Sequence, residues 1–259
     1  QGLVVGRRLL PAAGARSPSP GSLDARGARS ARAGRHAGPA ERGAFLIHEA
    51  GDEELVTCSG CGYAALRSWT APSWPEPPSE PELPPEEVET PGCNTIAQLA
   101  AFLDIPTART LKMVFCSVQG KVTGIAIRGD RSVDEAKLAR LLGTGQYYAS
   151  LEAELEAIGA VGGYASPVGL DPRRVRVVAD PSVRSARNLV GGANRPGYHL
   201  RNLNVSRDFQ PGEWADLALV EAGDPCSRCA SPLAIEPAFA LVHHRLAAPC
   251  RPAAEFLDP

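Results

Sequence analysis

Two Cys-x-x-Cys pairs, far apart in the chain, constrain the fold more than any other feature of this sequence. Cys58-Ser-Gly-Cys61 and Cys226-Ser-Arg-Cys229 each place two thiols on a tight turn, a geometry in which one pair can hold half of a tetrahedral zinc ion. The alternatives are two unrelated cysteine pairs or a redox pair. Neither pair lies in the strand-helix-strand context of thioredoxin-like redox motifs.

The spacing of the two pairs carries an architectural inference. Because 164 residues separate Cys61 from Cys226, a joint site can close only if the intervening chain begins and ends near one place. The sequence therefore predicts an inserted domain. Four thiolates would fill the coordination shell, so the expected zinc is structural rather than catalytic. The total of seven cysteines is odd, which fits a reducing compartment better than a complete disulfide framework.

Charge is distributed unevenly along the chain. Residues 1–42 carry eight arginines against Asp24 and Glu41 and show little periodic hydrophobicity, so we expect a disordered extension. An organelle transit peptide is the alternative. With a net charge of −2 for the whole chain, the remainder is acidic, and any nucleic-acid contact must be local. No long apolar run is present, so we expect no membrane span and a cytoplasmic location.

Composition also separates the middle of the chain from what precedes it. From Trp69 to Pro91, both included, there are eight prolines and six glutamates but no lysine or arginine, which is typical of an extended linker. The expected organisation is a disordered extension at 1–42, a zinc-ribbon-like unit at 43–68 and 221–246, a linker at 69–89, a mixed α/β domain at 90–220, and a tail at 247–259.

The middle region alternates helix and strand signals. Thr95 and Gln98 form a capping-box pattern at the start of a helix. Two apolar runs around the turn Gln119-Gly120 predict a hairpin of residues 111–118 and 121–128. A second capping box is predicted at Ser132 for a helix that stops at Gly143. We expect a third helix at 151–158 and short strands at 175–179, 188–190, 200–205 and 217–220.

Several short segments of this region occur in an order that is typical of one family. They are Thr90-Pro-Gly92 with Thr95-Ile96, Thr110-Leu-Lys112, Arg128-Gly-Asp130 with Glu135-Ala-Lys137-Leu138, Gly163 to Gly169, Gly192-Ala-Asn194, His199, Asn204, Arg207-Asp208 and Ala215-Asp216. With them, residues 90–220 resemble the editing domain of bacterial-type prolyl-tRNA synthetases and its freestanding relatives, the YbaK/ProX-like deacylases.

The flanking segments resemble the same synthetases. Phe45 to Ala65 is similar to the stretch that precedes the insertion in the catalytic domain, and Gly223 to Glu236 is similar to the stretch that follows it. The match then decays, because Pro237-Ala238 replaces an expected Gly-His pair and Leu66 an expected Asn. We recognise no class II motifs for ATP and no anticodon-binding domain. The resemblance thus implies an editing domain inserted into a zinc-ribbon-like remnant of a class II synthetase domain, without aminoacylation activity.

The resemblance also implies the residues of a site. Lys112, Gly163, Pro167 and His199 match the family's catalytic positions. The expected substrate contacts are Tyr164, Ala165, Ser166, Arg128, Asp180, Gly192 and Asn194. The expected zinc ligands are Cys58, Cys61, Cys226 and Cys229.

The chemistry of these residue types is compatible with ester hydrolysis. Lys112 interrupts an apolar strand, where a cation needs an anionic partner or water; the alternative is an edge-strand lysine that points to solvent. The glycine-rich loop can offer backbone N–H groups to a developing oxyanion, although such loops are often simple connectors. For His199 we favour substrate positioning over proton transfer. Arg128 and Asp130 have the alternative of pairing with each other to fix a turn.

The implied function is hydrolytic editing of mischarged tRNA. By double-sieve logic, a second pocket that accepts alanine but rejects proline removes the error of a proline-specific synthetase, so alanyl-tRNA(Pro) is the favoured substrate. The expected partners are the tRNA acceptor end and a prolyl-tRNA synthetase. The alternatives are a zinc-stabilised binding module that has lost catalysis, motivated by Asp134 where the family usually has Asn, and a fragment of a prolyl-tRNA ligase.

Overall fold

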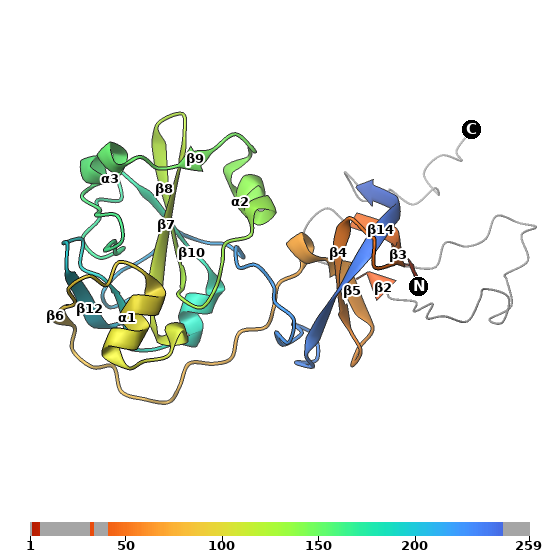
Figure 1. Cartoon of the computed structure of the whole chain (residues 1–259), viewed down its shortest axis with the longest axis horizontal. Coiled ribbons are helices and arrows are strands. Elements are labelled where there is room, and N and C mark those ends of the chain that lie inside the picture. The colour runs from red at the N-terminus through yellow and green to blue at the C-terminus, as the bar shows by residue number, and fades with distance from the viewer. Residues whose placement is uncertain (1, 6–31, 34–40, 246–259) are drawn as a thin grey trace, which may run out of the picture. The chain divides into compact units, whose positions relative to one another are not determined.

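The computed structural model describes residues 2–5, 32–33 and 41–245 of the chain (Figure 1). These residues form two compact units. Unit 1 combines the parts of the chain up to Ser73 and from Val220 onward, and unit 2 consists of Trp74–Leu219. No helix among the described residues is long and apolar enough to cross a membrane.

Unit 1 is built on a six-stranded sheet with the order β1-β3-β14-β4-β5-β2. Side chains alternate between the two faces of each strand, so Leu55 packs with Phe45 and Ala238 on one face while its neighbour Val56 packs with Tyr63 on the other. The elements are β1 Gly2–Val5, β2 Arg32–Ala33, β3 Glu41–Ile47, β4 Glu53–Cys58, β5 Tyr63–Leu66, the 3-10 helix η1 Arg67–Trp69, and β14 Leu233–Arg245.

The predicted extension and tail lie largely outside the described residues. Residues 247–259 fall there entirely, as does most of 1–42. Within 1–42, however, Gly2–Val5 and Arg32–Ala33 are strands, and for them the prediction of disorder is wrong. The physical reason is that β1 and β2 pair with β3 and β5 through backbone groups, and such pairing asks little of side-chain periodicity.

The chain leaves unit 1 and returns to it at one place. The backbone N–H of Ser73 donates to the carbonyl oxygen of Pro225 at 2.8 Å, and Pro72 forms an isolated bridge with Cys226. The ends of the long intervening segment therefore meet, as the spacing of the cysteine pairs requires.

Unit 2 contains two sheets and three short α-helices (Figure 1). The first sheet has the order β13-β10-β8-β7-β9, and the second has the order β11-β12-β6. A parallel bridge between Thr110 and Val190 connects the two. The strands are β6 Glu86–Glu89, β7 Leu111–Val118, β8 Lys121–Arg128, β9 Tyr148–Ala149, β10 Arg176–Ala179, β11 Leu189–Gly192, β12 Tyr198–Leu203 and β13 Glu213–Trp214; the helices are α1 Ile96–Leu103, α2 Glu135–Leu142, α3 Glu152–Ile158, and the 3-10 helices η2 Thr107–Arg109 and η3 Pro181–Ser185.

Local signals predicted the central hairpin and two of the helix ends. Strands β7 and β8 pair antiparallel around Gln119-Gly120, which both have positive φ. Thr95 caps α1, its hydroxyl accepting from the N–H of Gln98, whose side chain accepts from the Thr95 N–H in return. Helix α2 stops at Gly143 with a left-handed φ of 70°. These three predictions are confirmed.

The predicted start of α2 is wrong. The N-cap is Asp134, whose carboxylate accepts from the N–H of Lys137 at 3.0 Å, and not Ser132. The carbonyl of Ser132 instead accepts from the N–H of Leu219, and Val133 bridges to Ala218. Because these two residues pair with a distant segment in extended conformation, the helix cannot begin until the next turn.

The strand predicted at residues 217–220 is also absent; one bridge at Ala218 is all that the described chain has there. The carboxylate of Asp180 accepts from the N–H groups of Leu217 and Ala218, both at 2.8 Å, so a side chain replaces the ladder of a partner strand. The same carboxylate accepts from the N–H of Ser182 at 2.8 Å. Asp180 is fully buried. Solvent therefore cannot take the place of its carboxylate as the acceptor for these three N–H groups.

The predicted linker at 69–89 is only partly extended chain. Its last residues, Glu86–Glu89, form strand β6 and pair antiparallel with β12. The composition did not reveal this strand, because glutamates are poor strand formers and the pairing depends on β12 offering its free edge.

We predict that Asp180→Ala destabilises the chain by about 3 kcal/mol or more, because it leaves three buried N–H groups without an acceptor at about 1 to 3 kcal/mol each. Urea unfolding of unit 2, followed by circular dichroism, measures the change. Asp171→Ala is the matched control, since the Asp171 carboxylate bonds to the exposed Arg173 and its loss should change stability much less. Equal effects of the two variants would contradict the assignment.

Candidate functional site

A cavity of about 340 Å³ in unit 2 brings together five of the residues that the sequence singled out. Strand β7 supplies Lys112, the glycine-rich loop supplies Gly163 and Ala165, and the ends of β11 and β12 supply Gly192 and His199. Its remaining lining residues are Asn94, Thr95, Ile96, Leu99, Leu111, Met113, Phe115 and Gly162. The cavity thus combines one cation, one imidazole and glycine backbone with apolar walls.

Lys112 is a partly buried cation whose ammonium group does not point freely into solvent. Its Nζ donates to the backbone carbonyl of Arg131. Burial lowers the pKa of Lys112, and the nearby carboxylate of Asp130 opposes that shift. The ammonium group is thus partly desolvated, and it is bonded to the carbonyl of a residue that is not among those lining the cavity.

His199 is buried, with 4% of its surface exposed. Its Nδ1 lies 2.6 Å from the hydroxyl oxygen of Thr90, and its ring centroid lies 5.5 Å from that of Tyr164. Burial lowers the pKa of His199 and so favours the neutral form of the imidazole. Thr90 occupies Nδ1 and leaves Nε2 as the ring atom available for other contacts.

The glycine-rich loop is fixed by the turn between β11 and β12. The side chain of Asn194 accepts from the N–H of Ser166 at 2.9 Å and donates to the carbonyl oxygens of Ser166 and Val168. Gly192 approaches so closely that an added Cβ would lie 2.0 Å from the carbonyl oxygen of Tyr164. A side chain at Gly192 would therefore force the loop away from the turn.

The same loop leaves two backbone donors unused. The N–H groups of Tyr164 and Ser166 donate to Val161 and Asn194. For Gly163 and Ala165, which line the cavity, the described residues provide no acceptor. Gly163 has a φ of 77°, in the left-handed region that residues with a side chain rarely adopt.

Other residues predicted for substrate contact have partners elsewhere. Arg128 forms two hydrogen bonds to Asp130, including 2.6 Å from Nε to Oδ1, and lies over the ring of Trp74; this is the turn-fixing alternative. Asp180 holds backbone N–H groups, as described above. Tyr164, Ser166 and Asn194 do not line the cavity but shape its loop.

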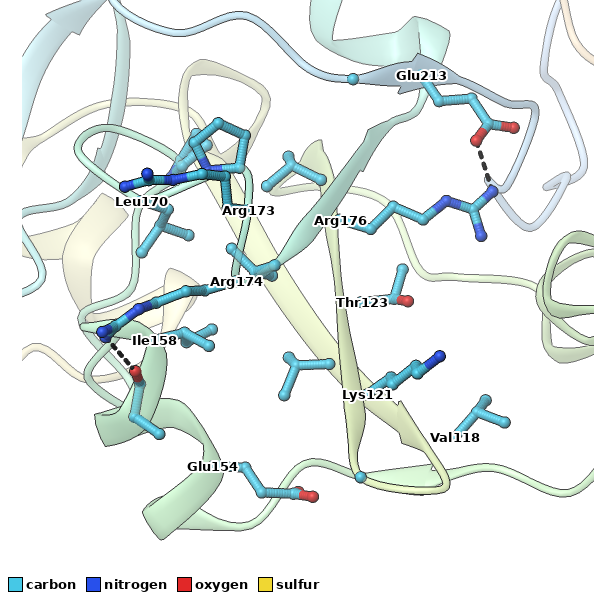
Figure 2. Close-up of a pocket in the computed structure, with 18 of the residues that line it drawn as sticks. Val118, Lys121, Thr123, Glu154, Ile158, Leu170, Arg173, Arg174, Arg176 and Glu213 are labelled. Carbon is cyan, nitrogen blue, oxygen red and sulfur yellow. Dashed lines mark hydrogen bonds and ion pairs between the residues drawn. The ribbon is translucent and has the colours of Figure 1, made fainter.

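Pro167 lines a second cavity, of about 1200 Å³, on another side of unit 2. Figure 2 shows Arg176 of this cavity paired with Glu213, while Arg174 reaches the carbonyl of Ala157. Most of its cations are thus already engaged, and none of the other predicted catalytic residues lines it. Pro167 accordingly ends the loop rather than facing the smaller cavity.

Sequence reasoning missed the buried Thr90 and the apolar walls. Thr90 belongs to one of the matching segments, but no pattern in the sequence marks its hydroxyl as the partner of the imidazole. The walls come from α1, with Ile96 and Leu99, and from β7, with Met113 and Phe115. Their helical and strand periodicity reads as ordinary core packing, so no local signal distinguishes a cavity wall from a core residue.

The four predicted metal ligands meet within unit 1. The Sγ atoms of Cys58, Cys61, Cys226 and Cys229 all lie within 4.8 Å of one another. The pair Cys58 and Cys229 is 3.5 Å apart, and the pair Cys61 and Cys226 is 3.8 Å apart. A tetrahedral zinc ion with bonds of about 2.3 Å separates its sulfur ligands by about 3.8 Å, so the donor set and its spacing are compatible with zinc.

Comparison with known proteins agrees with the resemblance found in the sequence. The family model described as "Aminoacyl-tRNA editing domain" matches residues 90–209. A proline-tRNA ligase of Dehalococcoides mccartyi is 39% identical over 192 residues, which are 74% of this chain and 33% of that protein. A proline-tRNA ligase of Aquifex aeolicus is 38% identical over 195 residues, 74% of this chain and 34% of that protein.

The chain thus spans about a third of the length of the curated relatives it matches. Among solved structures, one described as a putative trans-editing enzyme for prolyl tRNA synthetase has 19% sequence identity and a TM-score of 0.43, covering 52% of this chain and 86% of that one.

Proposed function

Residues 90–209 are an aminoacyl-tRNA editing domain related to that of prolyl-tRNA synthetases, and from this premise we propose that the chain hydrolyses the ester bond of mischarged tRNA. The observation that carries the proposal is a single cavity lined by Lys112, by His199 and by two loop residues whose N–H groups have no acceptor among the described residues. An activated ester needs positioning, oxyanion stabilisation and water rather than a strong nucleophile.

In the proposed reaction, a water oxygen attacks the ester carbonyl carbon, and the negative charge develops on the carbonyl oxygen. The N–H groups of Gly163 and Ala165 are the candidate donors to this oxyanion. Collapse of the intermediate breaks the bond to the ribose oxygen, which takes up a proton and leaves as the terminal hydroxyl of tRNA. Lys112 binds the negatively charged terminal nucleotide, and His199 positions the ribose or the water through Nε2.

The favoured substrate is alanyl-tRNA(Pro). The acyl group would lie against the apolar lining residues Ile96, Leu99 and Leu111, where a short side chain needs no polar partner. A synthetase pocket for proline cannot fully exclude the smaller alanine, so a second pocket of this kind removes the error. The partners follow from the substrate: the tRNA acceptor end and a prolyl-tRNA synthetase that charges the same tRNA in the cytoplasm.

We assign structural zinc to the cysteine cluster of unit 1. Four thiolates would complete the coordination shell of the zinc ion and leave no position for substrate water. The contribution of the zinc is therefore to hold the two Cys-x-x-Cys turns together. In this proposal unit 1 is the remnant of a synthetase catalytic domain into which the editing domain is inserted. We recognise no ATP motif in this sequence, and aminoacylation is not part of the proposed function.

Selective hydrolysis tests the function directly. Incubation of the purified chain with alanyl-tRNA(Pro) should release alanine at least about tenfold faster than it releases proline from prolyl-tRNA(Pro), within the range that a pocket difference of 1 to 3 kcal/mol supports. Acid-precipitable label remaining over time is the measurement. Equal persistence of both esters would reject the deacylase and leave a binding module.

Lys112→Ala should lower the deacylation rate about 100-fold, because it removes the poorly solvated cation from the cavity. Lys121→Ala is the matched control, since Lys121 is an exposed lysine of the adjacent strand that lines the other cavity. Full activity of Lys112→Ala would remove this lysine from the mechanism.

Gly163→Ala should lower the rate about tenfold or more, because a Cβ there meets Asn94 at 3.0 Å and strains the positive φ that directs the loop N–H groups. Gly169→Ala carries the same kind of strain, with a φ of 78°, but its Cβ would meet open space. The control should therefore lose stability to a similar degree while its deacylation rate at low temperature stays near that of the original chain. Similar losses of rate in both variants would show that loop strain alone, and not the oxyanion donors, accounts for the effect.

The purified chain should contain about one zinc ion, and Cys58→Ser or Cys226→Ser should lose it together with the thermal stability of unit 1. Metal content by plasma emission and thermal unfolding measure the two effects. Cys116→Ala is the control, because Cys116 is a buried core residue of unit 2 away from the cluster. Unchanged zinc content in the Cys58 variant would overturn the assignment.

A further inference from the structure

An acidic segment of unit 2 lies against a set of arginines. The strap, defined as residues 75–89, contains six glutamates and no basic residue. Its ion pairs are Glu80 with Arg109 at 2.7 Å, Glu82 with Arg207 at 3.7 Å and with Arg187 at 3.9 Å, and Glu87 with Arg195 at 2.9 Å. Three strap glutamates thus face four arginines that come from four places in the chain.

The contact between strap and domain is polar rather than hydrophobic. Leu83, the large apolar side chain of the strap, is 46% exposed. Backbone groups of the strap bond instead to side chains of the domain: the Leu83 N–H donates to Asn188, and Asn202 donates to the carbonyl of Pro84. Because little apolar surface is buried, the ion pairs are screened by salt and are individually weak.

The arginines are only partly covered by the strap. Their side-chain exposure runs from 32% for Arg207 to 55% for Arg195. A guanidinium group accepts a phosphate in the same forked geometry as a carboxylate. Exchange of a strap glutamate for another anion therefore requires no rearrangement of the domain core.

One of these arginines, Arg195, is close in sequence to two residues that line the cavity. Arg195 lies in the turn between Gly192 and His199, two residues that line the cavity. The strap ends with strand β6, which pairs with β12. The residue after it is Thr90, whose hydroxyl contacts His199. A polyanion bound at Arg195 would thus lie next to residues that line the cavity.

We propose that Arg109, Arg187, Arg195 and Arg207 form a docking surface for the phosphate backbone of the tRNA acceptor stem, and that the strap glutamates occupy this surface as competing anions until RNA replaces them. The inference rests on the proposed function for the identity of the RNA. It adds a binding surface outside the cavity and an internal competitor for it. The strap then lowers the affinity for every RNA and leaves the ester-binding cavity to select among them.

The test frees the arginines without removing the strap. In the full chain, Glu80→Gln, Glu82→Gln and Glu87→Gln are combined, and the affinity for unacylated proline tRNA is measured by filter binding from 50 to 300 mM salt. We expect roughly tenfold tighter binding near 0.1 M salt, since each weak ion pair removed is worth a few-fold. Arg207 keeps its pair with Asp208, so three freed arginines should steepen the salt dependence by about two to three counterions.

A matched triple variant separates this effect from net charge. Glu76→Gln, Glu86→Gln and Glu89→Gln change the charge of the same strap equally, but no ion pair is present for these glutamates in the described structure. They should leave the affinity within about twofold. If both triple variants bind tRNA equally, or if the first binds no tighter than the original chain, the surface is not the one proposed.

A second step identifies the arginines themselves. Adding Arg109→Ala, Arg187→Ala and Arg195→Ala to the first triple variant should abolish its gain in affinity; a persistent gain would place the RNA elsewhere. Because unacylated tRNA is the probe, the outcome does not depend on hydrolysis. Tighter binding without deacylation would retain the surface and reject the enzyme, whereas deacylation with unchanged binding would do the reverse.

Discussion

The candidate site depends on strand β11, a short and entirely buried strand that contacts every part of it. Through the bridge of Val190 to Thr110 it joins the strand that carries Lys112. Through the pairing of Gly192 with His199 it fixes the imidazole. At the same Gly192 it meets the backbone of the glycine-rich loop. The four residues of β11 therefore position three segments that are distant in sequence. A small displacement of β11 would move all three segments.

This arrangement explains which parts of the site the sequence could predict. Lys112, Gly163 and His199 each belong to a recognisable segment, and the structure brings them to one cavity. The sequence pattern does not distinguish residues that line the cavity from residues that support it. Asn194 and Asp180 have polar side chains like those that contact ligands, but both accept hydrogen bonds from backbone N–H groups. Only the three-dimensional partners of a buried polar group decide between the two roles.

The fold shows the same division between local and distant causes. The cap at Thr95 and the turn at Gln119-Gly120 are specified by neighbouring residues, and both were predicted. The start of α2 was not, because residues 132 and 133 pair with a segment more than eighty positions away. Strand β6 was missed for a related reason, since its pairing relies on the free edge of β12 while its own composition favours extended, unpaired chain.

The thiol cluster and the candidate cavity lie in different units. Unit 1 has a hydrophobic cluster on each face of its sheet and a group of thiols positioned for a metal, whereas the cavity is lined by residues of unit 2 alone. Four thiolates complete a zinc shell, so a metal in unit 1 has nothing to offer an ester. In our proposal zinc would hold the two Cys-x-x-Cys turns together, near Ser73 and Pro225, which are hydrogen-bonded to each other where the chain leaves unit 1 and returns to it. A domain whose two ends are held together in this way loses less conformational entropy on folding than a chain with free ends does.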